Sequence, residues 1–219
     1  SLLLYLSEWH SIFLALAGYG ALLAIVLHFV LFRRLPSRQK SQTPVATLVT
    51  NYGLVLRHRV TMRFVGLQAL CFSAMLVFIT HASFIYQEWF GLSNATFSAL
   101  FAANIVAMAS LNLLNRRLLN RYKSVRILRA CVFLQAIAVS LLVISAWAGA
   151  PYWVVAACII SSVGFMGAII PNNMANALEF FPHLGGTAAA MLGAAQFTIA
   201  GAISALSTAL AGGTLLPVV

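Results

Sequence analysis

Charged side chains are scarce in this sequence, and acidic ones are nearly absent. Only 7% of the 219 residues are charged, and 3 acidic residues stand beside 13 lysines and arginines, whereas an ordinary soluble domain has roughly 25% charged residues. Hydrophobic residues make up 62% of the chain. So few charges cannot cover the surface of a water-soluble protein. We therefore exclude a soluble enzyme, a disordered tail and a nucleic-acid-binding domain, despite the formal net charge of +10, and predict an integral membrane protein.

Cysteines and catalytic groupings are also few. The three cysteines, Cys71, Cys131 and Cys158, lie inside apolar runs, and their odd number and spacing argue against a disulfide framework or a zinc site. The sequence shows no paired acids and no nucleophile beside a base; the nearest grouping is Glu179 with His183, four residues apart. We expect no enzyme activity and no cofactor, and keep a membrane enzyme that uses this pair as an alternative.

Six apolar runs are long enough to cross a bilayer. A hydrocarbon core about 30 Å thick needs about 20 helical residues at about 1.5 Å each. The low polarity of the runs favours helices over the alternating strands of a membrane barrel. We predict an all-α, polytopic membrane helical bundle with spans at residues 11–32, 64–86, 94–114, 127–147, 152–178 and 186–210.

The positive charges are confined to two segments. The first contains Arg33, Arg34, Arg38, Lys40, Arg57, Arg59 and Arg63, and the second contains Arg116, Arg117, Arg121, Lys123, Arg126 and Arg129. Because Lys and Arg are retained in cytoplasmic loops, we place both segments in the cytoplasm and the first residues of the chain outside. The aromatic residues that favour the headgroup level then fall at external span ends: Trp9, Trp89, Trp147, Tyr152 and Trp153.

The first basic segment divides into two parts. Residues 33–44 are polar, contain Pro36 and Pro44, and are typical of a linker. In residues 45–63, apolar side chains recur at helical spacing beside arginines, which predicts an amphipathic helix on the inner membrane surface. A plain soluble linker is the alternative.

The polar side chains at membrane depth are neutral. No Asp, Glu, Lys or Arg lies in the middle of a span, and His28 and His81 lie near span ends. We interpret His81 as an interfacial hydrogen-bonding residue, with a proton relay as the alternative. In the fifth span Gly164 and Gly167 precede Pro171, which removes a backbone donor and predicts a kink. Apolar walls with a few amides suit a lipophilic ligand of varied shape.

Three groups of residues carry a resemblance to a known family. They are residues 78–88 (FITHASFIYQE), residues 101–106 (FAANIV) with 115–121 (NRRLLNR), and residues 172–175 (NNMA) with 181–188 (FPHLGGTA), followed by Gly193 and Phe197. On these residues the chain resembles the C-terminal half of major facilitator superfamily transporters. Within that superfamily it resembles the Bcr/CflA-type, or bicyclomycin-resistance, multidrug efflux transporters. The resemblance covers nearly the whole chain.

The resemblance implies that the chain has three parts. Residues 1–32 correspond to the last helix of the N-terminal half, residues 33–63 to the cytoplasmic loop between the halves, and residues 64–219 to an incomplete C-terminal half. The six spans are then helices six to eleven of twelve, and the other helices lie outside this sequence. Ser83 stands where the family often has proline, so this span lacks the family's usual bend-forming residue.

The resemblance also implies a function. It implies proton-coupled efflux of small lipophilic drugs by alternating access in a bacterial inner membrane, and hence antibiotic resistance. The implied partners are the lipid bilayer, a small lipophilic substrate, protons and the missing N-terminal half of the same transporter. Five candidate cavity residues match the family strings and three follow from position: Thr80, Phe84, Tyr86, Asn104 and Asn172, and then Met75, Asn173 and Gln196.

The second basic segment resembles the weaker copy of the family's cytoplasmic gating motif. Its residues are Arg116, Arg117, Asn120, Arg121 and Lys123. Asn120 stands in place of the aspartate and Lys123 in place of the glycine of the stronger copy, so we do not expect the charge-relay contacts of that copy here. A six-span membrane scaffold or channel subunit that oligomerises is the alternative function.

Overall fold

The computed structural model describes residues 10–32 and 45–210, and within these ranges every regular element is a helix. Six of the described helices are long and apolar enough to cross a membrane. They are Phe13–Val30, Arg59–Trp89, Asn94–Leu118, Ser124–Trp147, Tyr152–Leu178 and Gly185–Leu210. The predicted all-α membrane bundle is therefore confirmed.

The chain divides into two units, at Pro44 and Val45. The first unit contains the α-helix α2, His10–Leu27, which continues as the π-helix η1, His28–Phe32. These bounds agree with the predicted span 11–32. Several residues used for the topology prediction lie outside the described residues: Trp9, Arg33, Arg34, Arg38 and Lys40.

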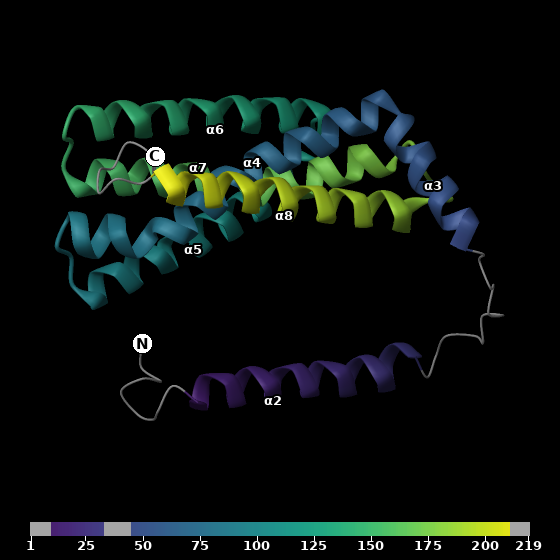
Figure 1. Ribbon diagram of the computed structural model, residues 1–219, viewed down its shortest axis with the longest axis horizontal. Helices are drawn as coiled ribbons and strands as arrows, with labels where there is room; N and C mark the ends of the chain where they lie inside the picture. The colour runs from purple at the N-terminus through teal and green to yellow at the C-terminus, as the bar shows by residue number, and fades with distance from the viewer. Residues whose placement is uncertain (1–9, 33–44, 211–219) are drawn as a thin grey trace. The chain divides into compact units, whose positions relative to one another are not determined.

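The second unit contains the other helices. They are α3 (Val45–Arg57), α4 (Arg59–Ser83) with the π-helix η2 (Phe84–Trp89), α5 (Asn94–Leu118), α6 (Ser124–Trp147), α7 (Tyr152–Leu178) and α8 (Gly185–Leu210). Successive helices from α4 to α8 run in alternating directions along the bundle (Figure 1). Helix α7 packs against α4, α5 and α6, and α4 also packs against α8. Helix α7 is therefore the central element of this unit.

Three predicted span ends differ from the structure at the basic segments. Helix α4 begins at Arg59 and not at residue 64, α5 ends at Leu118 and not at 114, and α6 begins at Ser124 and not at 127. The predicted amphipathic helix 45–63 correspondingly ends at Arg57. The reason is that long basic side chains extend to the headgroup region, so a spanning helix continues past the last apolar residue.

His58 ends α3 and begins α4. Its backbone is extended (φ −81°, ψ 97°), and its side chain accepts a hydrogen bond from the backbone N–H of Thr61 at 3.3 Å. A side-chain acceptor of this kind satisfies one of the free donors at a helix start. The His58 ring also lies 5.0 Å from the ring of Phe180 and 5.3 Å from that of Phe181, which ties this junction to the turn between α7 and α8.

The alternating helices place the described positive charges of the second unit at one end, which we call the basic end. The helix ends and the turn at this end contain these residues: Arg57, Arg59, Arg63, Arg116, Arg117, Arg121, Lys123, Arg126 and Arg129. The opposite, aromatic end carries Trp89, Trp147, Tyr152 and Trp153, and has its turns at Gly91 and Gly149, with φ of 63° and 62°. The two kinds of residue thus separate as the sequence predicts; that the basic end faces the cytoplasm stays a prediction.

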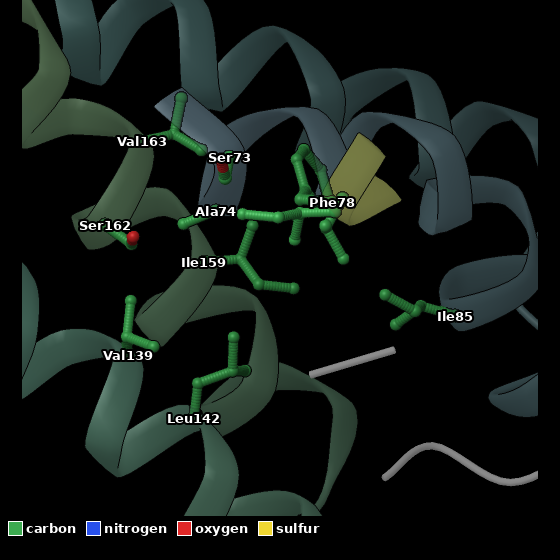
Figure 2. Close-up of a pocket in the computed structure, with 11 residues that line it drawn as sticks. Ser73, Ala74, Phe78, Ile85, Val139, Leu142, Ile159, Ser162 and Val163 are labelled. Atoms are coloured by element: carbon green, nitrogen blue, oxygen red, sulfur yellow. The ribbon is translucent and has the colours of Figure 1, made fainter. Parts of the chain in front are cut away.

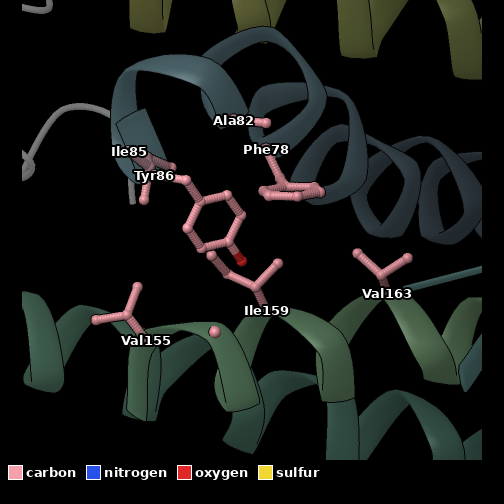
Figure 3. Close-up of a cluster of buried hydrophobic side chains, with 8 residues drawn as sticks. Phe78, Ala82, Ile85, Tyr86, Val155, Ile159 and Val163 are labelled. Carbon is pink, nitrogen blue, oxygen red and sulfur yellow. The ribbon is translucent and has the colours of Figure 1, made fainter. Parts of the chain in front are cut away.

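Two hydrophobic clusters hold the bundle together. The one near the aromatic end packs Phe78 and Tyr86 of α4 and η2 against Ile159 of α7 (Figure 3). The second joins α4, α6, α7 and α8 around Met166 and Ile169, which are both fully buried. Together they fix the rotation of α7, and hence which of its polar residues meet the neighbouring helices.

Candidate functional site

Two of the predicted cavity residues, Met75 and Asn104, line the same cavity. It lies between α4, α5 and α7 and has a volume of about 170 Å³; we call it the Asn104 cavity. Met75 and Asn104 lie near the middles of the spans 59–89 and 94–118. The other walls are apolar: Phe78, Ile79, Phe101, Ile105, Met108 and Val163. The cavity is therefore at mid-membrane depth and has one amide in an apolar lining.

Asn104 has an acceptor that no group of the described chain satisfies. The residue is 4% exposed, and its Nδ2 donates to the backbone carbonyl of Leu100 at 2.9 Å. Its Oδ1 is buried and makes no hydrogen bond. A buried unsatisfied acceptor costs free energy, but the surface that the cavity itself presents is apolar.

Thr80, Phe84 and Tyr86 do not line this cavity. Thr80 shares a hydrogen bond of 2.8 Å with Ser204 and so joins α4 to α8. Phe84 begins η2, and its ring lies 6.4 Å from that of Trp89. Tyr86 is fully buried in the aromatic-end cluster (Figure 3), and its hydroxyl makes no hydrogen bond there.

Asn173 and Gln196 belong to a chain of amides that links three helices. The Nδ2 of Asn173 donates to Gln68 Oε1 at 2.8 Å and to the backbone carbonyl of Phe64 at 2.9 Å. Gln68 in turn donates through Nε2 to Gln196 Oε1 at 2.7 Å. Asn173 is fully buried. These amides therefore fasten α4, α7 and α8 to one another.

Asn172 belongs to a different network, nearer the basic end. Its Nδ2 donates to Asn115 Oδ1 at 2.6 Å, and its Oδ1 accepts from Ser124 Oγ at 2.8 Å. Asn176 also donates to Ser124 Oγ, at 2.9 Å. The network joins α5, α6 and α7 where the two basic helix ends meet. Sequence reasoning missed Asn115, which it counted as the first residue of a loop.

The predicted gating residues surround this network. Arg116 and Arg117 lie in the last turn of α5, and Lys123 immediately precedes α6. Asn120 and Arg121 form the turn between them. All five side chains are exposed, whereas Asn115 is 5% exposed. The end of α5 is therefore anchored through Asn115, and the turn that follows presents its charges outward.

His81 makes the hydrogen bonds expected of an interfacial residue. It is 7% exposed, and its Nε2 lies 3.2 Å from Ser207 Oγ and 3.5 Å from Thr208 Oγ1. Both partners lie in the last turn of α8. These contacts agree with a hydrogen-bonding role for His81; the choice between an interfacial residue and a proton relay stays a prediction.

A second cavity, of about 200 Å³, lies between α4, α6 and α7, and none of the eight predicted cavity residues lines it (Figure 2). Its two polar side chains are Ser73 and Ser162. The Ser73 hydroxyl donates to the Ala69 carbonyl at 2.7 Å, so it is already satisfied. The cavity lining is therefore mainly apolar, with Ser162 as its other polar side chain.

The comparisons with known proteins place nearly the whole chain in one family. The model of the Major Facilitator Superfamily matches residues 1–205. The chain is 24% identical over 210 residues to the Bicyclomycin resistance protein homolog of Haemophilus influenzae, across 96% of this chain and 53% of that protein. It is 25% identical over 205 residues to the uncharacterized MFS-type transporter YdgK of Bacillus subtilis, across 94% and 51%. No solved structure matches it significantly.

The family match and the described helices agree with one another. The chain spans about half the length of the curated relatives that it matches. Six described helices long enough to cross a bilayer, together with a family match over nearly the whole chain, give a multi-pass membrane protein of a transporter family. The chain belongs to the Major Facilitator Superfamily of membrane transporters.

Proposed function

We propose that residues 1–219 form part of a transporter that exports small lipophilic compounds by alternating access, in exchange for protons. The observation that carries this proposal is the Asn104 cavity, an apolar mid-span pocket with one amide residue in its wall. Apolar walls accommodate ligands of different shapes, and a few polar groups beside them can orient a ligand without requiring a charge. The name of the Haemophilus relative, a bicyclomycin resistance protein homolog, supports export of a small drug.

Proton coupling in this proposal depends on a group outside the described spans. No Asp, Glu, Lys or Arg lies in the middle of a described helix, and His81 is held by two hydroxyls at the aromatic end. Intramembrane carboxylates are the usual proton carriers of transporters. We therefore assign the proton-linked carboxylate to the remainder of the transporter, and substrate contact to this lobe.

The test uses the full-length transporter that contains this sequence, in cells that lack other drug exporters. Accumulation of a neutral and of a cationic lipophilic dye is measured with and without a protonophore. Expression should lower the accumulation of at least one dye, and the protonophore should restore it. Unchanged accumulation contradicts efflux. A passive solute flux in proteoliposomes from a stable homo-oligomer would instead favour the channel-subunit alternative.

The role of the cavity is tested by Asn104→Leu, which keeps the size of the side chain and removes the acceptor. Export of a substrate with a hydrogen-bond donor should fall about tenfold, while export of a donor-free substrate changes little. Val106→Leu is the matched control, since Val106 lies on the same helix and is 64% exposed. Equal loss for both substrates in Asn104→Leu would place the effect on folding and not on recognition.

A further inference from the structure

The hydrogen bonds of the amide chain that links α7, α4 and α8 run in one direction only. The chain starts at the backbone carbonyl of Phe64, which accepts a hydrogen bond from the side chain of Asn173 at 2.9 Å. A carbonyl oxygen cannot donate, so the atom of Asn173 that faces it is the nitrogen Nδ2. This partner therefore fixes which end of the Asn173 amide points toward α4.

The same direction passes from Asn173 to Gln68 and then to Gln196. Asn173 Nδ2 also donates to Gln68 at 2.8 Å, so the Gln68 atom that it meets is the acceptor Oε1. The other end of the Gln68 amide, Nε2, lies 2.7 Å from Gln196 and requires an oxygen there. Gln68 is 4% exposed and Asn173 is fully buried, so neither amide turns over without losing hydrogen bonds that water does not replace. The Gln196 amide is therefore held with Oε1 toward α4 and Nε2 away from it.

Gln196 thus presents a hydrogen-bond donor at mid-membrane depth. The residue is half-buried and lies near the middle of the span Gly185–Leu210. Its hydrogen bond to the described residues is the one that Oε1 accepts from Gln68, and none of them accepts from Nε2. A free N–H group in contact with lipid hydrocarbon is costly, so polar side chains at this depth face a partner or a water-filled cavity.

We infer that Gln196 Nε2 donates a hydrogen bond to a carbonyl group of the exported compound, and that Gln68 is the positioning residue that sets this polarity. The inference rests on the proposed function and adds a substrate class to it, namely neutral lipophilic compounds with a hydrogen-bond acceptor. A glutamine that is free to rotate offers either its oxygen or its nitrogen; the amide chain removes that choice. An acceptor in the other half of the transporter is a poorer partner, because the halves separate during alternating access while the substrate site stays near the midplane.

The test compares the Kd values of two pairs of probes for the purified full-length transporter that contains this sequence. Benzophenone and 1,1-diphenylethylene have the same shape but differ in a carbonyl oxygen, which is an acceptor. Diphenylamine and diphenylmethane differ in an N–H donor. The wild type should bind benzophenone about tenfold more tightly than 1,1-diphenylethylene and should not prefer diphenylamine to diphenylmethane. Gln196→Leu should remove the preference for benzophenone.

The variant Gln68→Met tests the positioning role, because it keeps the length of the side chain and removes its amide. Gln196 then presents either end of its own amide and must be immobilised by the ligand. The preference for benzophenone should fall about threefold or more, and a preference for diphenylamine should appear. A loss of folding cannot produce this gain.

Gln135→Met is the matched control. Gln135 of α6 is also 4% exposed, and its Nε2 donates to the Ser162 carbonyl at 3.4 Å and lies 3.2 Å from Met166 Sδ. The substitution therefore removes a buried amide of the same kind outside the chain of Asn173, Gln68 and Gln196. It should lower the melting temperature but leave both probe preferences within about twofold.

Infrared spectroscopy of benzophenone with an isotope-labelled carbonyl detects the hydrogen bond itself. Donation by Gln196 should lower the carbonyl stretching frequency of the bound probe in the wild type and in Gln135→Met, but not in Gln196→Leu. Equal wild-type affinity for benzophenone and 1,1-diphenylethylene would overturn this inference alone, whereas failure to bind any of the four probes would also contradict the proposed lipophilic substrates. An unchanged benzophenone preference in Gln196→Leu, or equal probe preferences in Gln68→Met and Gln135→Met, would overturn it as well.

Discussion

The side-chain amide of Asn112 on α5 donates a hydrogen bond, at 3.0 Å, to the backbone carbonyl of Gly167 on α7. Gly167 lies four residues before Pro171, which stands inside α7. A proline has no N–H, so the carbonyl four residues earlier loses its helical partner. Asn112 therefore supplies the donor that Pro171 lacks, and the break in the α7 backbone ladder is compensated from a neighbouring helix.

Asn112→Leu should destabilise the transporter by about 1–3 kcal/mol, because it leaves the buried Gly167 carbonyl without a partner. Pro171→Ala restores a backbone N–H at the correct distance along the helix. The cost of Asn112→Leu should therefore be much smaller in a Pro171→Ala background. The apparent melting temperatures of the four proteins in detergent, at one heating rate, form a double-mutant cycle. Additive effects would show that Asn112 does not replace the missing donor.

Gly167→Ala should be among the most damaging small substitutions in the bundle. A Cβ atom there would meet the backbone carbonyl oxygen of Met108, closer than any real contact permits. Backbone cannot rotate away as a flexible side chain can, so α5 and α7 must separate, at a cost of about 1–3 kcal/mol or more. Gly66→Ala is the control, since a methyl group at that position would have no neighbouring atom within 4 Å. Equal melting temperatures for both variants would contradict the close approach.

Tyr86→Phe should leave the melting temperature unchanged or raise it. The Tyr86 hydroxyl is fully buried and has no hydrogen-bond partner, so its removal ends a desolvation penalty without breaking a bond. Phe78→Leu, in the same cluster, removes packed ring atoms and should lower the melting temperature. A clear loss of stability in Tyr86→Phe would reveal a partner for the hydroxyl. A loss of export alone would assign the hydroxyl to substrate contact, as the family resemblance implies.

The orientation of the bundle can be tested with single cysteines, after replacement of Cys71, Cys131 and Cys158. Asn120→Cys lies in the exposed turn at the basic end, and Ala148→Cys lies in an exposed turn at the aromatic end. A membrane-impermeant maleimide added to intact cells should label Ala148→Cys and spare Asn120→Cys, because positive loops stay in the cytoplasm. The reverse pattern would invert the predicted topology.

Much of the helix layout follows from hydropathy alone. The predicted span 152–178 has the same bounds as α7, and 186–210 differs from α8 by one residue. The errors fall where arginines continue a helix beyond its apolar part, as at the start of α4 and the end of α5. At these positions the side chains are charged although the backbone is still helical.

The partners of the polar residues could not be predicted in the same way. Asn172 and Asn173 are neighbours in the sequence, but successive residues on a helix point about 100° apart. Asn172 consequently meets Asn115 and Ser124, whereas Asn173 meets Gln68. Which residue faces which helix depends on the rotation of α7, and packing across the bundle sets that rotation. Met75 and Asn104 line one cavity because both lie near mid-span on their helices; that a substrate binds there stays a prediction.

The contact of the His58 ring with Phe180 and Phe181 has a mechanical consequence. Helix α3 also lies against α8, and Val55 is fully buried among Ala188 and Met191. A displacement applied at Val45 is thus transmitted by side chains to the turn between α7 and α8, as well as through the backbone to α4. Helix α3 is thus attached to this unit at two points besides the backbone, and a force on it would be shared by helices distant in the chain.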